Sequence, residues 1–407
     1  MRISTAHSFD ASIENLQKRQ SDLAQSQVQL SSGKRVNKAS DDPIGAAQAE
    51  RALAAISRSD ANQRSLDASR GAMQLSESAI GSTVELLQQA RETIVAAGNG
   101  SYTDHERQSL AIKLKEIRNQ LLAVANSPDG GGGYIFGGQG SSSPPFIDAP
   151  GGVQFVGQGG QVQASSGEAL NLTVDGDLVW LKAKAGNGVY VTNPVAGNTG
   201  TGWITTGSVS TPSAVPYPAA PAATPDQYSI DFTVSAGVTT YSILKNGAAT
   251  AVTNASYVGG QAIGIDGMSF SISGQPATGD KFTINQSTNS LSVFDTLDSA
   301  INSLNQTGPN SGQISQAVNK GLGNIDSLLS NVQAARTSVG ESLNRMDGIE
   351  SRISAAKLAA QGSRSAAEDL DMAQGISNFQ NQQTGYEAAL KSYAMIQKLS
   401  LFQYING

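Results

Sequence analysis

The sequence lacks cysteine and is poor in histidine, aromatic residues and charge. Among its 407 residues there are no cysteines and two histidines; 5% of the residues are aromatic and 15% are charged. The absence of cysteine excludes disulfides and thiolate metal ligands. Soluble domains carry about 25% charged residues, so the low charge indicates helix surfaces that neighbours cover. A net charge of −6 offers no basic surface for nucleic acid, which we do not expect as a partner.

The residues that usually carry catalysis are sparse and dispersed. The two histidines lie far apart in the sequence, whereas general-base or metal chemistry needs several such groups in one site. The Gly33-Lys34 pair resembles the end of a phosphate-binding loop. However, Val28 occupies the place of the first glycine of that loop and Arg35 the place of its Ser or Thr. We therefore expect no enzyme activity, no catalytic residue, no cofactor and no metal site.

Neither a membrane span nor a cleaved secretory signal is visible. No apolar run reaches the roughly 18 residues that a spanning helix requires, so we expect no membrane insertion. The start Met1-Arg2-Ile3-Ser4-Thr5 lacks the charged patch and apolar core of a secretory signal. Taken alone, this pattern indicates a cytoplasmic protein, but it leaves room for export by a route that needs no cleaved signal.

An apolar residue recurs every seventh position at both ends of the chain. The first series is Leu16, Leu23 and Leu30. Later members are Leu66, Met73, Ile80, Leu87 and Ile94. Toward the C-terminus the spacing is mostly an alternation of four and three residues, in the series Val318, Leu322, Ile325, Leu329, Val332, Val339, Leu343, Met346 and Ile353. This spacing forms a narrow apolar stripe on a helix, and a partner helix must cover that stripe. We expect both chain ends to contribute to one helical rod.

Such stripes usually form the core of an ordinary bundle, so assembly with other chains needs further support. That support comes from long helices at both ends, low charge and an apolar tail at residues 399–405 (LSLFQYI). Near the N-terminus, Gln20 and Gln27 occupy companion positions of the repeat, and helices are marginal without packing. We therefore expect the terminal helices to be disordered in the monomer and ordered by neighbours.

Capping residues predict where two helices begin in the first half of the chain. Asp42 is a candidate N-cap followed by Pro43 at the first helical position. The helix that it opens should continue to about Ala97 and span about 80 Å. Thr103 and Glu106 form a capping box that opens the next helix.

The helical pattern returns after residue 290. A short helix is predicted over residues 294–305 and a long one from Ser311 to about Leu358. Ser365 with Glu368 matches a second capping box. This box predicts a final helix over about residues 366–404.

Glycine, proline and short alternating runs replace the seven-residue repeat in the middle of the chain. Candidate strands lie at residues 188–192, 228–234, 239–244, 269–272 and 281–284. We expect Trp180 and Trp203 to pack in a core or between strands. The predicted fold is α+β and multidomain: a long α-helical coiled-coil or bundle rod formed by both chain ends, with a central β-rich insertion.

This organisation predicts three regions. Residues 1–42 and 360–407 form terminal helices that are disordered in the monomer. Residues 43–145 and 290–359 form the helical rod domain, and residues 146–289 form the β-rich outer domain. Such a chain suits a subunit that assembles through its ends.

A series of motifs resembles the flagellin superfamily. The block at residues 30–47 (LSSGKRVNKASDDPIGAA) resembles its N-terminal signature. The start at residues 1–5 and the runs at 97–100 (AGNG), 117–122 (IRNQLL), 134–138 (YIFGG) and 399–405 resemble the branch that joins the flagellar hook to the filament. The resemblance covers roughly residues 1–145 and 300–407, and the motifs occur in order with the right separations.

The resemblance implies a structural subunit of the bacterial flagellum. It implies export by the flagellar type III apparatus without a cleaved signal, and an extracellular location in the flagellum. The implied partners are a hook-associated protein on the hook side, flagellin on the filament side, further copies of the chain in a ring, and a flagellar export chaperone. The terminal helices would line the inner tube of the assembly, the next helices would form its outer shell, and the β domain would face outward.

The apolar stripes and tail supply the candidate site residues. The expected assembly interface comprises Leu16, Leu23, Leu30, Leu390, Tyr393, Ile396, Leu399 and Phe402. The resemblance implies that the export chaperone covers the C-terminal segment, for which the candidate contacts are Met372, Ile376, Phe379, Tyr386 and Leu390. Residues 88–92 (QQARE) match the receptor-recognised stretch of flagellins only in part, since Gln89 replaces its first arginine. We expect no strong recognition by innate receptors.

Two other functions remain open. The chain could be a filament flagellin, although the Asp42-Pro43-Ile44 form and the aromatic ending speak against it. A function of another class is an exported β-domain binding protein or adhesin on a helical stalk. An enzyme within the β insertion is a third possibility, but no His–Glu cluster supports it.

Overall fold

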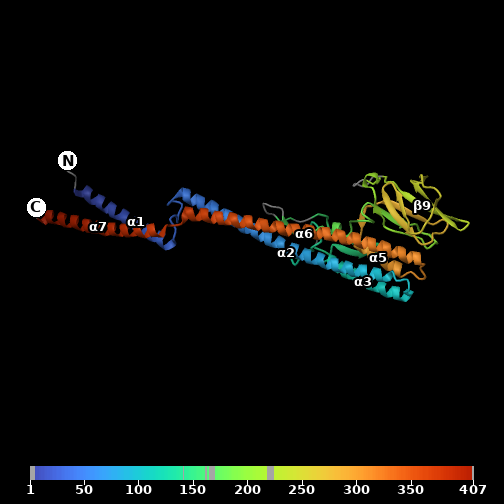
Figure 1. Ribbon diagram of the computed structural model, residues 1–407. Helices are drawn as coiled ribbons and strands as arrows, with labels where there is room; N and C mark the ends of the chain where they lie inside the picture. Colours follow the sequence, from blue (N-terminus) through green and yellow to red (C-terminus); the bar gives the residue numbers. More distant parts are fainter. Residues whose placement is uncertain (1–4, 141, 161–162, 165–169, 218–223, 406–407) are drawn as a thin grey trace. The chain divides into compact units, whose positions relative to one another are not determined.

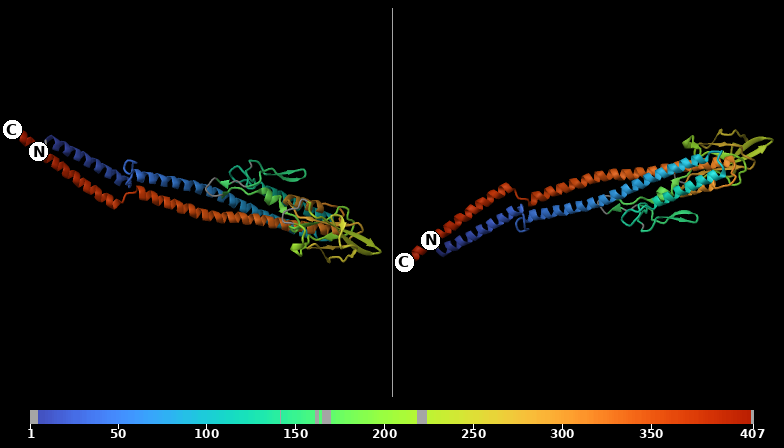
Figure 2. Two further views of the ribbon diagram at one scale, coloured as in Figure 1. Left: turned by 90° about the horizontal axis from the view of Figure 1, so that it is seen from above. Right: turned by 90° about the horizontal axis from the view of Figure 1, so that it is seen from below.

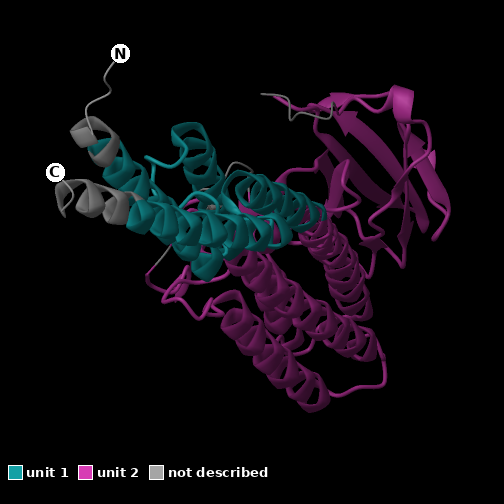
Figure 3. Ribbon diagram, turned by 90° about the vertical axis from the view of Figure 1, so that its left-hand side faces the viewer, with its two compact units in different colours: residues 1–64, 348–407 teal, residues 65–347 magenta. Residues whose placement is uncertain are grey.

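The computed structural model describes residues 5–140, 142–160, 163–164, 170–217 and 224–405. Long helices occupy both ends of the chain, and short strands lie between them (Figure 1), which confirms the α+β multidomain class. The chain forms two compact units (Figure 3). Unit 1 comprises Met1–Arg64 with Gly348–Gly407, and unit 2 comprises Ser65–Asp347. The division into three regions by the residue bounds given above stays a prediction.

Unit 1 is built from the two terminal helices and the parts of two longer helices that adjoin them. Its elements are α1 (Thr5–Ser32), α7 (Met372–Ile405), the start of α2 (Pro43–Ala97) and the end of α6 (Ser311–Glu368). Helices α1 and α7 lie side by side in every view (Figures 1 and 2). The Ser26 hydroxyl donates a hydrogen bond to Gln382 Oε1. Leu30 packs near Gly375, where an added Cβ would approach Leu30 Cδ2 to 3.3 Å.

Two predicted helix starts are confirmed by their caps. Asp42 Oδ1 accepts the amide N–H groups of Ile44 at 3.1 Å and Gly45 at 2.9 Å, at the first turn of α2. Helix α3 (Asp104–Ala125) begins with the capping box, in which Thr103 Oγ1 accepts the Glu106 N–H and Glu106 accepts the Thr103 N–H. Each cap satisfies N–H groups that have no partner inside the helix.

The second predicted capping box is wrong, and so is the predicted end of the preceding helix. Helix α6 continues past Leu358 to Glu368, so Ser365 lies inside it and its hydroxyl donates to the Asp369 carboxylate. The helical conformation is interrupted at residues 369–371, and α7 begins at Met372. Its cap is Asp371, whose Oδ1 accepts the Ala373 and Gln374 N–H groups at 3.0 and 3.1 Å. A Ser-x-x-Glu pattern is equally compatible with a helix interior, where the N–H groups are already bonded.

Unit 2 contains the helical part whose core the apolar repeat predicts. On its part of α2 the large residues of the repeat are buried: Leu66, Met73, Ile80, Leu87 and Ile94. On its part of α6 the buried members include Ile325, Val332, Val339 and Met346. Gly321 on α6 lies against Ile94, with an added Cβ only 3.3 Å from its side chain. The stripe therefore acts here as an intramolecular core.

Helix α3 packs against α5 (Val293–Leu304), which confirms the short helix predicted there. Arg118 of α3 is buried and donates to both carboxylate oxygens of Asp148, at 2.7 and 2.8 Å. Its Nε also lies 2.7 Å from Asp298 Oδ1 on α5. The bond from Arg118 lowers the pKa of the Asp148 carboxyl. One guanidinium thus joins α3, α5 and strand β1 (Phe146–Ala149).

A cluster of aromatic rings fills the space beside α5. Trp180, at the end of α4 (Gly176–Trp180), is fully buried. It stacks on Phe294 with ring centroids 5.8 Å apart and meets the edge of Phe136 at 5.5 Å. Phe146 completes the cluster. This confirms the core position predicted for Trp180.

Among the described residues, the β module of unit 2 comprises two packed sheets and three short strand pairs. The larger sheet contains β6 (Tyr190–Pro194), β9 (Tyr228–Ser235), β10 (Val238–Lys245), β11 (Ala248–Ala249), β12 (Ala255–Ser256) and β15 (Lys281–Gln286), in the order β11-β10-β9-β15-β6 with β12 on β10. The smaller sheet contains β7 (Trp203–Ile204), β8 (Ser208–Val209), β13 (Ala262–Ile265) and β14 (Met268–Ser273). The short pairs are β1 with β2 (Gly152–Phe155), β3 (Gln163–Ala164) with β4 (Leu170–Asn171), and β5 (Ala183–Lys184) with β16 (Asn289–Leu291). A 3-10 turn spans Pro212–Ala214.

All five predicted strands occur, with small shifts at their ends. Alternate residues of β9, β14 and β15 face one shared core, which includes Ile230, Phe270 and Phe282. Trp203 lies half-buried in β7 opposite Ser273, in agreement with the inter-strand position predicted for it.

Side-chain amides of α6 form hydrogen bonds with backbone groups of strand β7 and helix α4. Gln316 Oε1 accepts the Ile204 N–H at 2.8 Å, and Gln316 Nε2 donates to the Ile204 carbonyl at 3.4 Å. Asn331 Nδ2 donates to the carbonyls of Leu178 and Val179 at 3.0 Å each. Gln316 thus pairs with strand β7, whereas Asn331 bonds to carbonyls in the last turn of α4 that have no partner inside that helix.

We expect Trp180→Ala to lower the free energy of unfolding by about 3–5 kcal/mol, because it removes a buried ring from a packed cluster. Chemical denaturation followed by circular dichroism measures the change. Leu178→Ala is the matched control, since Leu178 is 55% exposed two residues away. Equal losses in the two variants would contradict the packing role of Trp180.

Candidate assembly interface

In unit 1 the segment between α1 and α2 lies beside the segment between α6 and α7, so both helical stretches are interrupted at the same level. Between α1 and α2 the chain leaves the helix at Gly33, which has a φ of +70° that glycine adopts without strain. The break between α6 and α7 lies directly against it. Arg35 N–H and Val36 N–H donate to the Glu368 carbonyl at 2.6 and 3.3 Å, and Leu370 N–H donates to the Gly33 carbonyl at 2.9 Å. We call this paired break, residues 33–45 with 364–371, the joint.

Charged side chains reinforce the joint. Arg35 donates to Asp42 Oδ2 at 3.0 Å and to the Ala367 carbonyl at 2.8 Å. Lys34 Nζ lies 3.2 Å from Glu368 Oε1, which also accepts from Arg364 at 2.8 Å. These residues come from both ends of the sequence, so the signature block at residues 30–47 is held by the end of α6.

The sequence motifs pointed to this block, but they did not reveal its partner. The signature was recognisable in the sequence. The contact of Arg35 with the Glu368 carbonyl was not, because it depends on where α6 ends. The misassigned box at Ser365 placed that end too early. Asp371, followed by a helical run, was the available signal for the break.

The predicted interface residues lie on α1 and α7, where burial is incomplete. Leu16, Leu23, Leu30, Phe379, Tyr386 and Tyr393 are half-buried. Leu390 is 42% exposed, and Met372 and Ile376 are each 47% exposed. The side chains of Ile396, Leu399 and Phe402 lie outside the described residues.

Among the described side chains of α1 and α7, no hydrophobic one is buried. The contrast is with α2 in unit 2, where Leu66, Met73 and Ile80 are at most 1% exposed. Helices α1 and α7 cover each other only on one side. Their pair therefore has a stripe but no closed core of its own.

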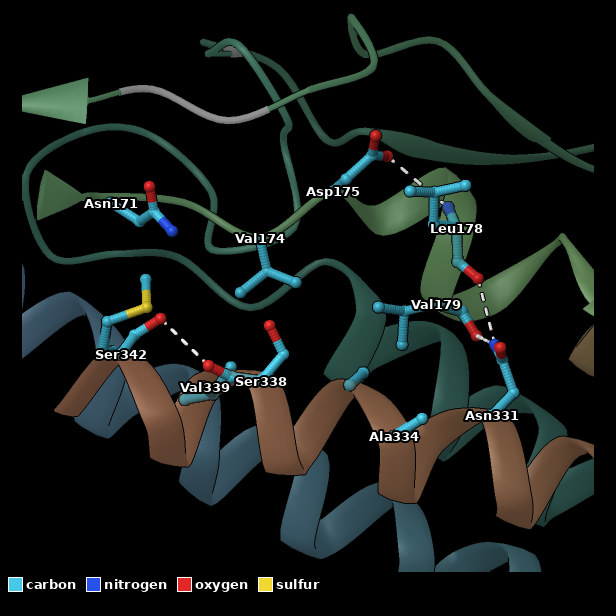
Figure 4. A pocket seen from close by; sticks show the side chains of 12 residues that line it. Asn171, Val174, Asp175, Leu178, Val179, Asn331, Ala334, Ser338, Val339 and Ser342 are labelled. Atoms are coloured by element: carbon cyan, nitrogen blue, oxygen red, sulfur yellow. Dashed lines mark hydrogen bonds between the residues drawn. The ribbon is translucent and has the colours of Figure 1, made fainter. Parts of the chain in front are cut away.

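Unit 2 also contains a groove of about 230 Å³ between α6 and residues 171–179 (Figure 4). Its walls combine apolar or small residues, among them Val174, Leu178 and Ala334, with the polar residues Asn171 and Asn331. Asp175 is the one carboxylate among the described lining residues, and its oxygens accept the N–H groups of Gly160, Asp177 and Leu178. This carboxylate is engaged in capping α4.

In the described part of the chain, no three acidic or histidine side chains gather in a way that could hold a metal ion. None of the described helices is both long and apolar enough to cross a membrane.

Two family models match the two helical ends. Residues 3–141 match the bacterial flagellin N-terminal helical region, and residues 322–405 match the bacterial flagellin C-terminal helical region. Together these matches include more than half of the chain. The chain belongs to the bacterial flagellin superfamily. The unmatched middle of this flagellin-superfamily chain contains the β module.

Within the superfamily, the similarity is greater to proteins named for the hook. Flagellar hook-associated protein 3 of Salmonella typhimurium is 39% identical over 160 residues, which are 37% of this chain and 48% of that protein. The Escherichia coli protein of the same name is 34% identical over 187 residues, 43% of this chain and 56% of that protein. Polar flagellin F of Vibrio parahaemolyticus is 29% identical over 150 residues. The chain spans about half the length of the curated hook-associated relatives that it matches.

Solved structures give the same result over more of the chain. The flagellar hook-associated protein-3 of Legionella pneumophila superposes with a TM-score of 0.71 at 26% identity, over 77% of this chain and 97% of that chain. A structure described as the flagellar junction protein of the same organism gives a TM-score of 0.68 at 27% identity, over 79% of this chain and all of that chain. These shares exceed the part of the chain that the two family models match, so the likeness extends into the middle.

The cap at Asp42 should make the first turn of α2 sensitive to acid. The Gly45 N–H and, next, the Arg35 guanidinium hold the pKa of the Asp42 carboxyl below its ordinary 3.8. A lowered folded-state pKa stabilises the fold above the ordinary value, and that stabilisation is lost as the pH falls through the lowered value. Amide exchange protection at Ile44 and Gly45 should therefore fall in this acid range. Asp42→Asn should keep the cap without the titration, and an equal acid loss in that variant would contradict the assignment.

Proposed function

We propose that this protein is a structural subunit of the bacterial flagellum that joins hook and filament and assembles through its terminal helices. The observation that supports this most is the absence of a buried hydrophobic side chain among the described residues of α1 and α7. Full burial of a large aliphatic side chain contributes about 1.5–3 kcal/mol. Because several such residues of the stripe are half-exposed, their further burial by other copies of the chain would lower the free energy of the assembly.

The stripe supports a monomer with disordered ends and an assembly with ordered ones. Coupling order to assembly keeps the free subunit from polymerising, because an unpaired end gains too little by ordering. In the assembly, the interface comprises Leu16, Leu23, Leu30, Leu390, Tyr393, Ile396, Leu399 and Phe402. Copies of the chain form a ring, with a hook-associated protein on one side and flagellin on the other.

The route to that position is export through the flagellar type III apparatus, without a cleaved signal, to an extracellular site. An export chaperone covers the C-terminal helix before assembly, contacting Met372, Ile376, Phe379, Tyr386 and Leu390. Support for a protein contact here is the exposure of Met372 and Ile376 on α7. The role is structural and not enzymatic.

Deleting the gene tests this function against its alternatives. A junction protein predicts hooks without filaments, together with unpolymerised flagellin in the medium, because export continues but the filament has no base. Hooks without filaments and no flagellin outside would indicate that the chain is itself the filament subunit. Normal filaments would contradict both and favour a separate binding role for the β module.

Substitution of the stripe should abolish assembly without unfolding unit 2. Leu16→Asp and Leu390→Asp each place a charge on an apolar surface that other chains cover in the assembly. Expression of either variant in the deletion strain should therefore fail to restore filaments. Circular dichroism of the purified variants should show an unchanged thermal transition for unit 2. Gln17→Asp is the matched control, since Gln17 is exposed beside the stripe. Normal filaments with either leucine variant would count against the proposed interface.

A further inference from the structure

The seven-residue repeat of apolar residues at the contact between α2 and α6 in unit 2 does not by itself fix how far one helix is shifted along the other. Its buried large residues repeat every seven positions on both helices. The small positions between them on α2 repeat in the same way and are also buried: Ser69, Ser76, Thr83 and Ala90. Sliding one helix by seven residues would therefore bring most large residues against residues of the same kind again. The exception is Ile94, which packs on Gly321 and would face Leu328 or Ile314 instead.

Charged pairs at the edge of this contact do not repeat in that way. Asp60 of α2 and Lys357 of α6 form one such pair in unit 1, at 2.7 Å. The three described pairs within unit 2 are Arg70–Asp347, Glu77–Arg336 and Arg91–Asp326, with closest N···O distances of 3.0, 2.5 and 2.8 Å. Along α2 the signs are positive, negative and positive, and along α6 the partners carry the opposite sequence of signs. We call these three pairs the ladder.

A shift of seven residues in either direction brings like charges together. In one direction Asp347 leaves Arg70 and reaches the level of Glu77, so two carboxylates face each other. In the other direction Arg336 leaves Glu77 and reaches the level of Arg70, so two guanidinium groups face each other. The native register is the one of these three in which all the pairs are complementary.

We infer that the ladder specifies the axial register of α2 against α6. Exposed ion pairs contribute little to stability, and these are exposed, with Asp347 at 73% and Asp326 at 53% side-chain exposure. Their contribution lies in discrimination: they disfavour the two shifted arrangements, in which the close contact of Ile94 with Gly321 is also lost. The inference does not depend on the proposed function.

A distance measured along the rod tests the inference on the full chain. The sequence has no cysteine, so Ala68→Cys on α2 and Ser330→Cys on α6 give two defined sites for spin labels. Both positions are exposed and lie several turns apart. A shift of seven residues would change their separation along the axis by about 10 Å, which double electron–electron resonance resolves.

The neutral variant D326N/R336Q/D347N should show a second distance displaced by about 10 Å from the native one. The reversed variant D326R/R336E/D347R should shift most of the population to displaced distances. Adding R70E/E77R/R91E to the reversed variant should restore the single native distance, because the pairs are then complementary again. The control E85Q/E92Q/E341Q, which neutralises the same number of exposed charges outside the ladder, should keep the native distance.

A single native distance in the neutral variant would overturn the inference, because the register would then be held without the ladder. A second distance in the control variant would also overturn it, since loss of any charge would have the same effect. Failure of the doubly reversed chain to regain the native distance would show that complementarity is not the cause.

Discussion

The need to bury a narrow apolar stripe against another helix is the constraint on which this structure depends. In unit 2 the chain meets it internally: the stripe of α2 is closed over, with residues such as Leu66 and Ile80 fully buried. In unit 1 the same kind of stripe on α1 and α7 is closed on one side only. The same sequence pattern therefore forms a buried core in unit 2 and a partly exposed apolar surface in unit 1.

The joint marks where the partly exposed apolar surface of unit 1 begins. The α1–α2 and α6–α7 connections lie at one level, and backbone hydrogen bonds that involve Gly33, Glu368 and Leu370 join them. Arg35 adds a fork between Asp42 and the Ala367 carbonyl. An isolated helix break would leave backbone groups without partners, whereas paired breaks satisfy each other.

Much of the fold followed from local chemistry that the sequence displays. Asp42-Pro43 and the Thr103–Glu106 box gave helix starts, because a cap acts within a few residues. The alternation in residues 228–234 and 281–284 gave strands for the same reason. The Ser365–Glu368 box failed because the same spacing is allowed inside a helix. The pairing order of the strands was not readable either, since it depends on pairings such as Ser273 with Trp203 that join distant segments.

The candidate site was predictable in its position but not in its mechanics. The stripes marked α1 and α7 from spacing alone, yet how much of each stripe the partner helix covers is a property of the packed pair. The resemblance to flagellins identified the block at residues 30–47, whereas its bonds to the end of α6 needed the structure. Arg118 is similar: its run was recognisable, but its role in joining α3, β1 and α5 came from Asp148 and Asp298.

The most direct test of the account is amide hydrogen exchange on the free subunit and on the subunit assembled in isolated flagella. We expect residues 10–30 and 372–395 to exchange rapidly in the free subunit and slowly in the assembly. Residues 66–94 of α2 should be protected in both states, because their core is internal. Strong protection of α1 and α7 in the free subunit would contradict the central claim that these helices are completed by other chains.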